Sequence, residues 1–185
     1  MSHGGYKIRD QSATYFITFA VVNWVDVFTR KEYRDIVVES IRYCQQEKGM
    51  ILYGWCLMSN HVHMIVSAKF NNLSGMLRDF KKYTSKQIIQ AIAAHPRESR
   101  KEWMLDIFSS AGKANKRNSE YQFWQQDNEP KQLFSRHFTE QKLDYIHNNP
   151  VVAAVVDKAE EYLYSSARNY YYGKNCGVLD IAFLS

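Results

Sequence analysis

The sequence has few of the residues that stabilise small disulfide-linked or zinc-thiolate proteins. Its three cysteines, Cys44, Cys56 and Cys176, are far apart and form no CxxC pair. An odd number of widely spaced cysteines argues against a disulfide framework and against a thiolate zinc site. We therefore expect free thiols.

Long apolar runs and extreme charge are also missing. No run of about 18 apolar residues occurs, so no membrane partner is expected. The opening MSHGGYKIRD has no apolar signal-peptide core, so we expect a soluble, unexported, cytoplasmic protein. The net charge of +5 is only mildly basic. It favours an anionic partner without identifying one.

What is present indicates one ordinary globular domain over residues 1–185. The chain is 45% hydrophobic and 23% charged, which is enough apolar material for a core. β-Branched and aromatic runs predict strands, and apolar spacing of three and four predicts helices. The expected elements are a strand at 14–22, a helix at 33–49, a hairpin at 50–68 turning at Ser59-Asn60, and a helix at 73–95.

The second half of the chain is less regular. Residues 95–120 are rich in charge and indicate a polar loop or peripheral insertion, and residues 120–134 a strand or hairpin. Residues 138–149 predict a helix that Pro150 stops, followed by an aromatic tail of undefined fold. Because parallel crossovers are too few for a doubly wound sheet, we expect an α+β fold with an antiparallel sheet flanked by helices.

Two histidines lie one residue apart in the apolar stretch WCLMSNHVHMIVSA. Side chains alternate across a strand, so His61 and His63 share one face about 7 Å apart along the backbone. Two imidazoles on one face can converge on a single cation, although two hydrogen-bonded surface or edge histidines would leave the same pattern. A metal site needs a third ligand from elsewhere.

The segment KLDYIHNNP offers that ligand. On a helix, Tyr145 and Asn149 are four residues apart and lie on one face, whereas His147 is nearly opposite. If this face meets the histidine strand, Asn149 can supply a carbonyl oxygen and Tyr145 a phenolic hydroxyl. The alternative is an asparagine at a helix end beside a packed tyrosine.

Taken together, MSNHVHMIV and LDYIHNNPV resemble the two signature segments of single-tyrosine HUH transposases, in particular the REP-associated tyrosine transposases. FWQQ and YSSA also resemble that branch in kind and order, and the likeness spans about residues 14–170. Ser59 stands where the family usually has proline. Asn149 agrees with the REP-associated branch, whereas classical members carry glutamine there.

The resemblance implies a ferredoxin-like HUH fold and a DNA transposase that cleaves and rejoins single-stranded or hairpin DNA. By this similarity, His61, His63 and Asn149 bind Mg²⁺ or Mn²⁺, and Tyr145 attacks the scissile phosphate to give a 5′-phosphotyrosine and a 3′-hydroxyl. Some members are homodimers that complete each site with the partner's tyrosine helix, and others act as monomers.

The acidity of a phenol agrees with a need for a metal ion in this chemistry. A phenol with a pKa of about 10 is ionised in about one molecule per thousand at neutral pH, so a Lewis acid on the phosphate is needed to offset the difference. Two imidazole nitrogens and one amide oxygen with open positions suit Mn²⁺ or Mg²⁺ better than a structural zinc site.

Basic side chains are the expected contacts to the DNA backbone, with solvated surface charge as the alternative. The candidates on the helix after the histidine strand and in the polar segment are Lys81, Lys82, Lys86 and Arg117. Among aromatic residues, Trp55, Trp124 and Phe123 could stack bases, but core packing is favoured for each.

Two other hypotheses stay open. Tyr83 is a second candidate nucleophile, with Gln87 as its amide four residues later. The protein could also be a metal-dependent nuclease that uses water, or a noncatalytic nucleic-acid-binding domain whose histidines are merely packed.

Overall fold

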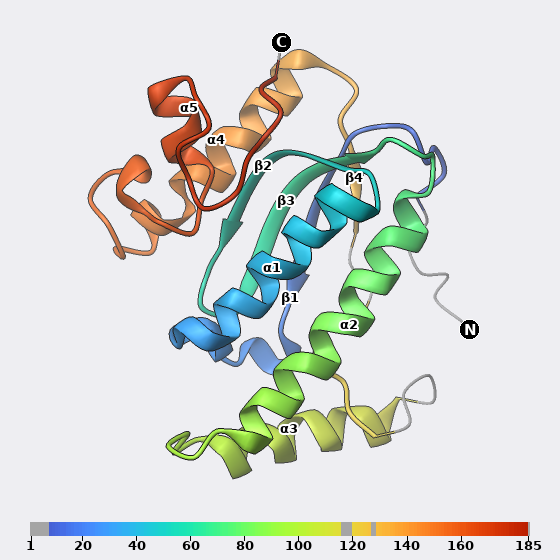
Figure 1. Cartoon of the computed structure of the whole chain (residues 1–185), viewed down its shortest axis with the longest axis vertical. Helices are drawn as coiled ribbons and strands as arrows, with labels where there is room; N and C mark the ends of the chain where they lie inside the picture. Colours follow the sequence, from blue (N-terminus) through green and yellow to red (C-terminus); the bar gives the residue numbers. More distant parts are fainter. Residues whose placement is uncertain (1–7, 116–119, 127–128, 185) are drawn as a thin grey trace.

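The computed structural model describes residues 8–115, 120–126 and 129–184. A four-stranded antiparallel sheet with strand order β2-β3-β1-β4 forms its centre (Figure 1). This is the order of a ferredoxin-like sheet, so the predicted α+β class with an antiparallel sheet is confirmed. The strands are β1 (Tyr15–Ala20), β2 (Met50–Leu57), β3 (His61–Ala68) and β4 (Lys131–Gln132).

Helices cover both faces of the sheet. In Figure 1, α1 and α2 lie across the front of the sheet, and α4 and α5 lie on its other side toward β2. The α-helices are α1 (Lys31–Glu47), α2 (Leu73–Ala94), α3 (Lys101–Ala114), α4 (Arg136–Val152) and α5 (Ala167–Tyr172). Three short 3₁₀ turns are η1 (Val22–Trp24), η2 (Val27–Thr29) and η3 (Ala159–Glu161). Among the described residues, no helix has the length and apolar content needed to span a bilayer.

Strand alternation divides the side chains of β3 between two hydrophobic clusters. Val62, Met64 and Val66 are 0% exposed and join the larger cluster under α1 and α2. Ile65 points to the other face, where it packs with Leu143 of α4 in the smaller cluster. The histidines share that second face, so the sheet presents them on the side that carries α4.

A glycine allows α4 to approach the sheet closely. A Cβ atom at Gly54 of β2 would lie 2.6 Å from Leu143 Cδ1, and the strand pairing shifts register between Leu52 and Gly54. The missing side chain leaves the space that Leu143 fills. This contact helps to set how closely α4 approaches the sheet.

Pro150 does not stop α4, contrary to the sequence-based prediction. The helix continues to Val152, and Ala153 N donates to Asn149 O at 3.0 Å, which closes the turn beyond the proline. A proline this close to the C-terminus of a helix removes one amide donor, and the last turn can form without that hydrogen bond. As a result, Asn149 lies inside the helix and keeps a fixed relation to the turns before it.

The segment 95–120, predicted to be a polar loop or a peripheral insertion, contains a helix and is not a continuous loop. Residues 101–114 form α3, whose buried residues Met104, Phe108 and Gly112 recur every fourth position. Leu105, Ile107 and Ala111 pack beside them as partly buried residues, so α3 is an amphipathic helix that buries one side.

The segments around β4 and the C-terminal tail are only partly strand-like. Among the described residues of the segment 120–134, strand pairing is limited to β4 and an isolated bridge between Val21 and Trp124. Trp55, Phe123 and Trp124 are 0%, 1% and 4% exposed, so the preference for core packing is confirmed. The aromatic tail forms η3, α5 and a segment along β2, where Ala182 N donates to Leu52 O at 2.8 Å.

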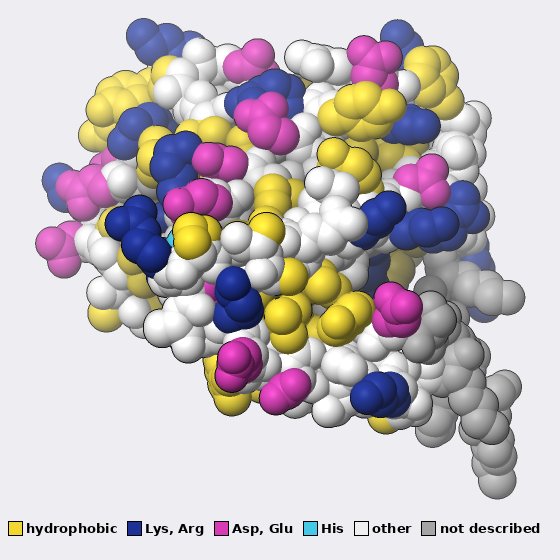
Figure 2. All heavy atoms as spheres, turned by 60° about the horizontal axis from the view of Figure 1, so that its bottom comes forward, with side chains coloured by type: hydrophobic (Ala, Val, Ile, Leu, Met, Phe, Trp, Pro, Cys, Tyr) yellow, Lys and Arg dark blue, Asp and Glu magenta, His cyan; other side chains and the backbone are white. Residues whose placement is uncertain are grey.

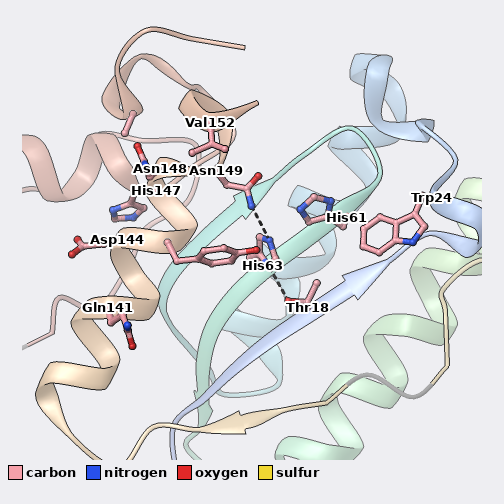
Figure 3. Close-up of a pocket in the computed structure, with 12 residues that line it drawn as sticks. Thr18, Trp24, His61, His63, Gln141, Asp144, His147, Asn148, Asn149 and Val152 are labelled. Atoms are coloured by element: carbon pink, nitrogen blue, oxygen red, sulfur yellow. Dashed lines mark hydrogen bonds between the residues drawn. The ribbon is translucent and has the colours of Figure 1, made fainter. Parts of the chain in front are cut away.

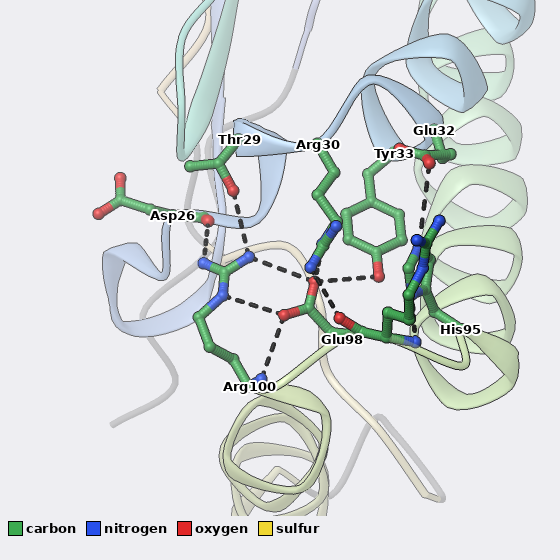
Figure 4. Close-up of polar contacts among 9 residues, drawn as sticks. Asp26, Thr29, Arg30, Glu32, Tyr33, His95, Glu98 and Arg100 are labelled. Carbon is green, nitrogen blue, oxygen red and sulfur yellow. Dashed lines mark hydrogen bonds and ion pairs between the residues drawn. The ribbon is translucent and has the colours of Figure 1, made fainter.

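A buried carboxylate ties the loop before α3 to the start of α1 (Figure 4). The Glu98 side chain is 0% exposed and accepts hydrogen bonds from Arg30 Nε at 2.6 Å, Arg100 Nε at 3.2 Å and Tyr33 Oη at 3.2 Å. Arg100 also donates to Asp26 O at 2.8 Å. Burial alone would raise the pKa of Glu98, but the hydrogen bonds from Arg100 and Arg30 outweigh it and lower the pKa to about 2.

Glu98→Gln is expected to lower the free energy of unfolding at pH 7 by about 2–3 kcal/mol, because the arginines lose their buried anion. A depressed carboxyl pKa stabilises the fold above the unfolded value of 4.5 and loses this effect as the pH falls toward about 2. The difference between wild type and variant, measured by urea unfolding, should therefore shrink between pH 5 and pH 2.

Glu140→Gln is the matched control for this prediction. Glu140 pairs with Arg136 at 2.8 Å, but the two side chains are 52% and 78% exposed. Losing such a surface pair should change the free energy of unfolding by less than about 0.5 kcal/mol. A Glu98 variant that behaves like the Glu140 variant would contradict the role assigned to the buried carboxylate.

Candidate active site

The two histidines lie side by side on β3, on the face of the sheet that carries α4. His61 begins β3 opposite Ala20, and His63 pairs with Thr18 of β1. Their ring centroids are 4.6 Å apart. They border a groove of about 990 Å³ between the sheet and α4 (Figure 3), lined by Thr18, Trp24, His61, His63, Gln141, Asp144, Tyr145, His147, Asn148, Asn149, Val152 and Ala159.

Helix α4 brings the predicted tyrosine and amide to the same groove. Asn149 Nδ2 lies 3.1 Å from His63 Nε2 (Figure 3). The Tyr145 ring is 5.3 Å from the His63 ring between centroids, and the side chain is 51% exposed. The structure thus brings together all four side chains that the two sequence segments singled out, within one chain.

Hydrogen bonds fix which ring nitrogen of each histidine faces the groove. An amide nitrogen only donates, so the Asn149 contact leaves His63 Nε2 as an acceptor, and His63 Nδ1–H donates to Thr18 Oγ1 at 2.7 Å. His61 Nδ1 donates in the same way to Asn60 Oδ1 at 2.7 Å. His61 therefore presents the lone pair of Nε2 to the groove, and the lone pair of His63 Nε2 faces the amide of Asn149.

The environment also keeps both histidines neutral. Burial lowers the pKa of His63 to about 3, with smaller contributions from the neighbouring His61 and from the Lys142 ammonium. Burial likewise lowers the pKa of His61. At neutral pH both imidazoles are unprotonated at Nε2, which is the form that binds a metal ion.

This donor set fits an openly coordinated divalent cation rather than a closed structural site. Among the described residues, no three His, Cys, Asp or Glu side chains cluster as metal ligands. The groove instead offers two imidazole nitrogens and the amide of Asn149, and each imidazole has the outer hydrogen-bond partner that ligating histidines usually have. Such a set leaves positions for substrate oxygens.

Two further residues at the groove were missed by reasoning from the sequence. Lys142 Nζ lies 5.7 Å from the centroid of the Tyr145 ring and 5.1 Å from that of Phe16. Its spacing of three and seven residues before Tyr145 and Asn149 places it on the same helix face, a signal that was available in the sequence. Trp24, 54% exposed, lies in a 3₁₀ turn that carries no such signal.

Three of the basic residues proposed to contact DNA, Lys81, Lys82 and Lys86, do not line the groove of the histidines. Lys82 and Lys86 are exposed on α2, and Lys81 Nζ donates to Gln125 O at 3.1 Å. With residues 120–126 they line a separate depression. Arg117 falls outside the described residues. Figure 2 shows Lys and Arg side chains interspersed with Asp and Glu on the face it presents, without a uniformly basic patch among the residues that the structure describes. The role of the four basic residues in DNA binding stays a prediction.

The second candidate nucleophile is also remote from the histidines. Tyr83 is 57% exposed and lies with Gln87 in a groove between α1 and α2. These helices cover the opposite face of the sheet. Of the two tyrosines considered, Tyr145 is the one beside the imidazoles.

Comparisons with known proteins agree with this architecture. The family described as IS200-like transposases matches residues 11–118. No curated protein matches the sequence. The structure is similar to that of a REP-associated tyrosine transposase bound to a REP hairpin, with a TM-score of 0.65 and 16% identity, over 100% of this chain and 96% of the other.

A second solved structure, of a provisionally assigned transposase from Deinococcus radiodurans R1, is 16% identical over 80% of this chain and 97% of the other. Its TM-score of 0.40 is too low to establish a common fold. At 16% identity, the similarity to the REP-associated transposase establishes the fold alone. The family match covers β3, the strand that carries both histidines.

Proposed function

Because the chain belongs to the family of IS200-like transposases, we propose that it cleaves and rejoins single-stranded DNA through a covalent intermediate on Tyr145. The observation that carries the proposal is the position of the Tyr145 ring, 5.3 Å from that of His63 in the same chain. The family match ends at residue 118, so the role of Tyr145 depends on this geometry and on the resemblance of its helix.

In the proposed reaction, Tyr145 cleaves one phosphodiester bond of the DNA. The Tyr145 oxygen attacks the phosphorus, the bond to the 3′ oxygen breaks, and a 5′-phosphotyrosine forms. The half-exposed hydroxyl can release its proton to water in the open groove, and water can protonate the departing 3′ oxygen. The new phosphodiester keeps the energy of the old one, so a 3′-hydroxyl can reverse the reaction and join strands.

The histidines and Asn149 would hold a divalent ion, Mg²⁺ or Mn²⁺, which supplies Lewis-acid stabilisation of the scissile phosphate. Thr18 and Asn60 keep the Nε2 atoms of the two rings directed at the groove. The ammonium of Lys142 adds a fixed positive charge beside Tyr145, where negative charge develops on the phosphate. Since one chain provides all these groups, a site formed by a single copy is favoured over one completed by a dimer partner.

Hairpin DNA with single-stranded flanks is the first substrate to test, because the structural relative is bound to a REP hairpin. The oligonucleotide is labelled at one end, incubated with protein and Mn²⁺, and resolved under denaturing conditions. A 3′ label should stay with the protein, and a 5′ label should leave as a shorter strand ending in a 3′-hydroxyl. Cleavage without a covalent species would indicate a water-using nuclease, and binding alone a noncatalytic domain.

Thr18→Val is expected to raise the Mn²⁺ concentration needed for half-maximal cleavage by about 10- to 100-fold, because His63 loses the acceptor that orients its ring. The measurement is the rate of adduct formation across a Mn²⁺ titration. Thr139→Val, in which the lost hydroxyl bonds only Ser135 O of α4, is the control. An unchanged titration in the Thr18 variant would argue against His63 as a ligand.

A further inference from the structure

An exposed tryptophan stands at one end of the groove. The indole of Trp24 is 54% exposed and meets the His61 ring edge to face, with centroids 5.8 Å apart. In Figure 3 it lies on the side of His61 away from α4. Trp55 and Trp124, by contrast, are buried in the core. Because Trp24 also lines the groove, its exposed indole offers a flat face on which a nucleobase could stack.

The backbone that presents this ring adopts an unfavourable conformation. Asn23 and Trp24 have φ angles of 53° and 54°, in the left-handed region that residues with a side chain rarely adopt. The turn is held by bonds on both sides, from Trp24 N to Val21 O at 3.0 Å and from Val22 N to Phe123 O at 2.8 Å. Strain that the surroundings maintain in this way is often associated with function.

One amide links the tryptophan to the candidate metal ligand. Asn60 Nδ2 donates to Trp24 O at 3.2 Å and to Asp26 Oδ1 at 3.0 Å, while Asn60 Oδ1 accepts from His61 Nδ1. Ser59 Oγ also donates to Asp26 Oδ1, at 2.6 Å. The same side chain therefore holds the backbone of the Trp24 turn and the ring of His61.

We propose that Trp24 stacks on an unpaired nucleobase of the DNA strand next to the scissile phosphate. The proposal rests on the proposed function, since it takes the strand to run along the groove from Tyr145 past the histidines to Trp24. Stacking on an indole face is tolerant of sequence but needs a base that is not already stacked in a duplex. Trp24 would thus favour single-stranded substrate at this point of the groove.

Binding is measured in a Tyr145→Phe background, so that no cleavage intervenes, with hairpin oligonucleotides carrying one abasic site at each flanking position in turn. Trp24→Ala should weaken binding of the intact DNA by about 5- to 150-fold. One abasic position should cause a similar loss, and at that position Trp24→Ala should cause no further loss. Trp24→Phe, which keeps an aromatic face, should restore part of the affinity.

Trp103→Ala is the matched control, because Trp103 is equally exposed at 54% but lies on α3 outside the groove. It should bind intact DNA as the parent does. The stacking role is overturned if Trp24→Ala binds as tightly as its parent, or if it weakens every abasic substrate as much as the intact one. The abasic scan on the parent protein needs no Trp24 variant, so a folding defect cannot imitate the result.

The two proposals fail in different ways. Covalent adducts from a protein with Tyr145 intact, combined with binding that ignores Trp24, would keep the proposed function and overturn the stacking role. Position-specific loss of binding in Trp24→Ala, without any adduct from the wild-type protein, would keep the stacking role and overturn the covalent mechanism.

Discussion

Tyr145→Phe is expected to abolish the denaturant-stable protein–DNA species, with a loss of at least about 10³-fold in its rate of formation. The substitution removes one oxygen atom. The ring that packs 6.0 Å from Phe16 and 5.3 Å from His63 stays in place. Hairpin binding, measured by fluorescence polarisation, should therefore be nearly unchanged while the covalent product disappears.

Tyr83→Phe is the control for this loss, since Tyr83 is a similarly exposed tyrosine on a helix. It should form adducts at the wild-type rate. If the covalent species persisted in Tyr145→Phe and vanished in Tyr83→Phe, the nucleophile would lie on α2 and the assignment of the groove would be wrong. Cleavage that survives in both variants would indicate water as the nucleophile.

His61→Ala is expected to lower cleavage by about 10³-fold and to leave DNA binding largely intact, because the ion acts on one phosphate while many contacts supply affinity. His61 begins its strand and is only partly buried, so its removal is less disruptive to packing than that of His63. Single-turnover adduct formation at saturating DNA, with and without Mn²⁺, measures the effect.

His137→Ala is the corresponding control, because His137 is exposed near the start of α4 and does not line the groove. Its cleavage rate and its response to Mn²⁺ should match the wild type. Undiminished cleavage by His61→Ala would rule out His61 as a ligand. Equal residual rates with and without Mn²⁺ would agree with a site that can no longer bind the ion.

Much of the fold follows from local patterns in the sequence. The apolar runs of β1 to β3 are buried on both faces of the sheet, and the apolar periods of α1 and α2 each match one buried face. The site was predictable for the same reason: strand alternation places His61 with His63, and helical spacing places Tyr145 with Asn149. That the two pairs face each other was not deducible from spacing, since it depends on how α4 packs against Gly54.

The errors arise where tertiary contacts outweigh local signals. The charged residues of the segment 95–120 outweighed the apolar spacing of α3 in the prediction from sequence, although Met104, Phe108 and Gly112 bury one side of that helix. Pro150 was taken as a helix stop, although a single lost donor is tolerated in the last turn. Trp24 owes its place to a strained turn held by Asn60, more than thirty residues away in the sequence, which no periodicity reveals.

Asn60 contacts both a candidate metal ligand and the turn that carries the proposed stacking residue. Its amide oxygen accepts from His61 Nδ1, and its amide nitrogen donates to the backbone oxygen of Trp24. A substitution at Asn60 is therefore expected to disturb the His61 ring and the turn that carries Trp24 together, so the proposed ion site and the proposed base contact would respond to a single change in the hairpin turn.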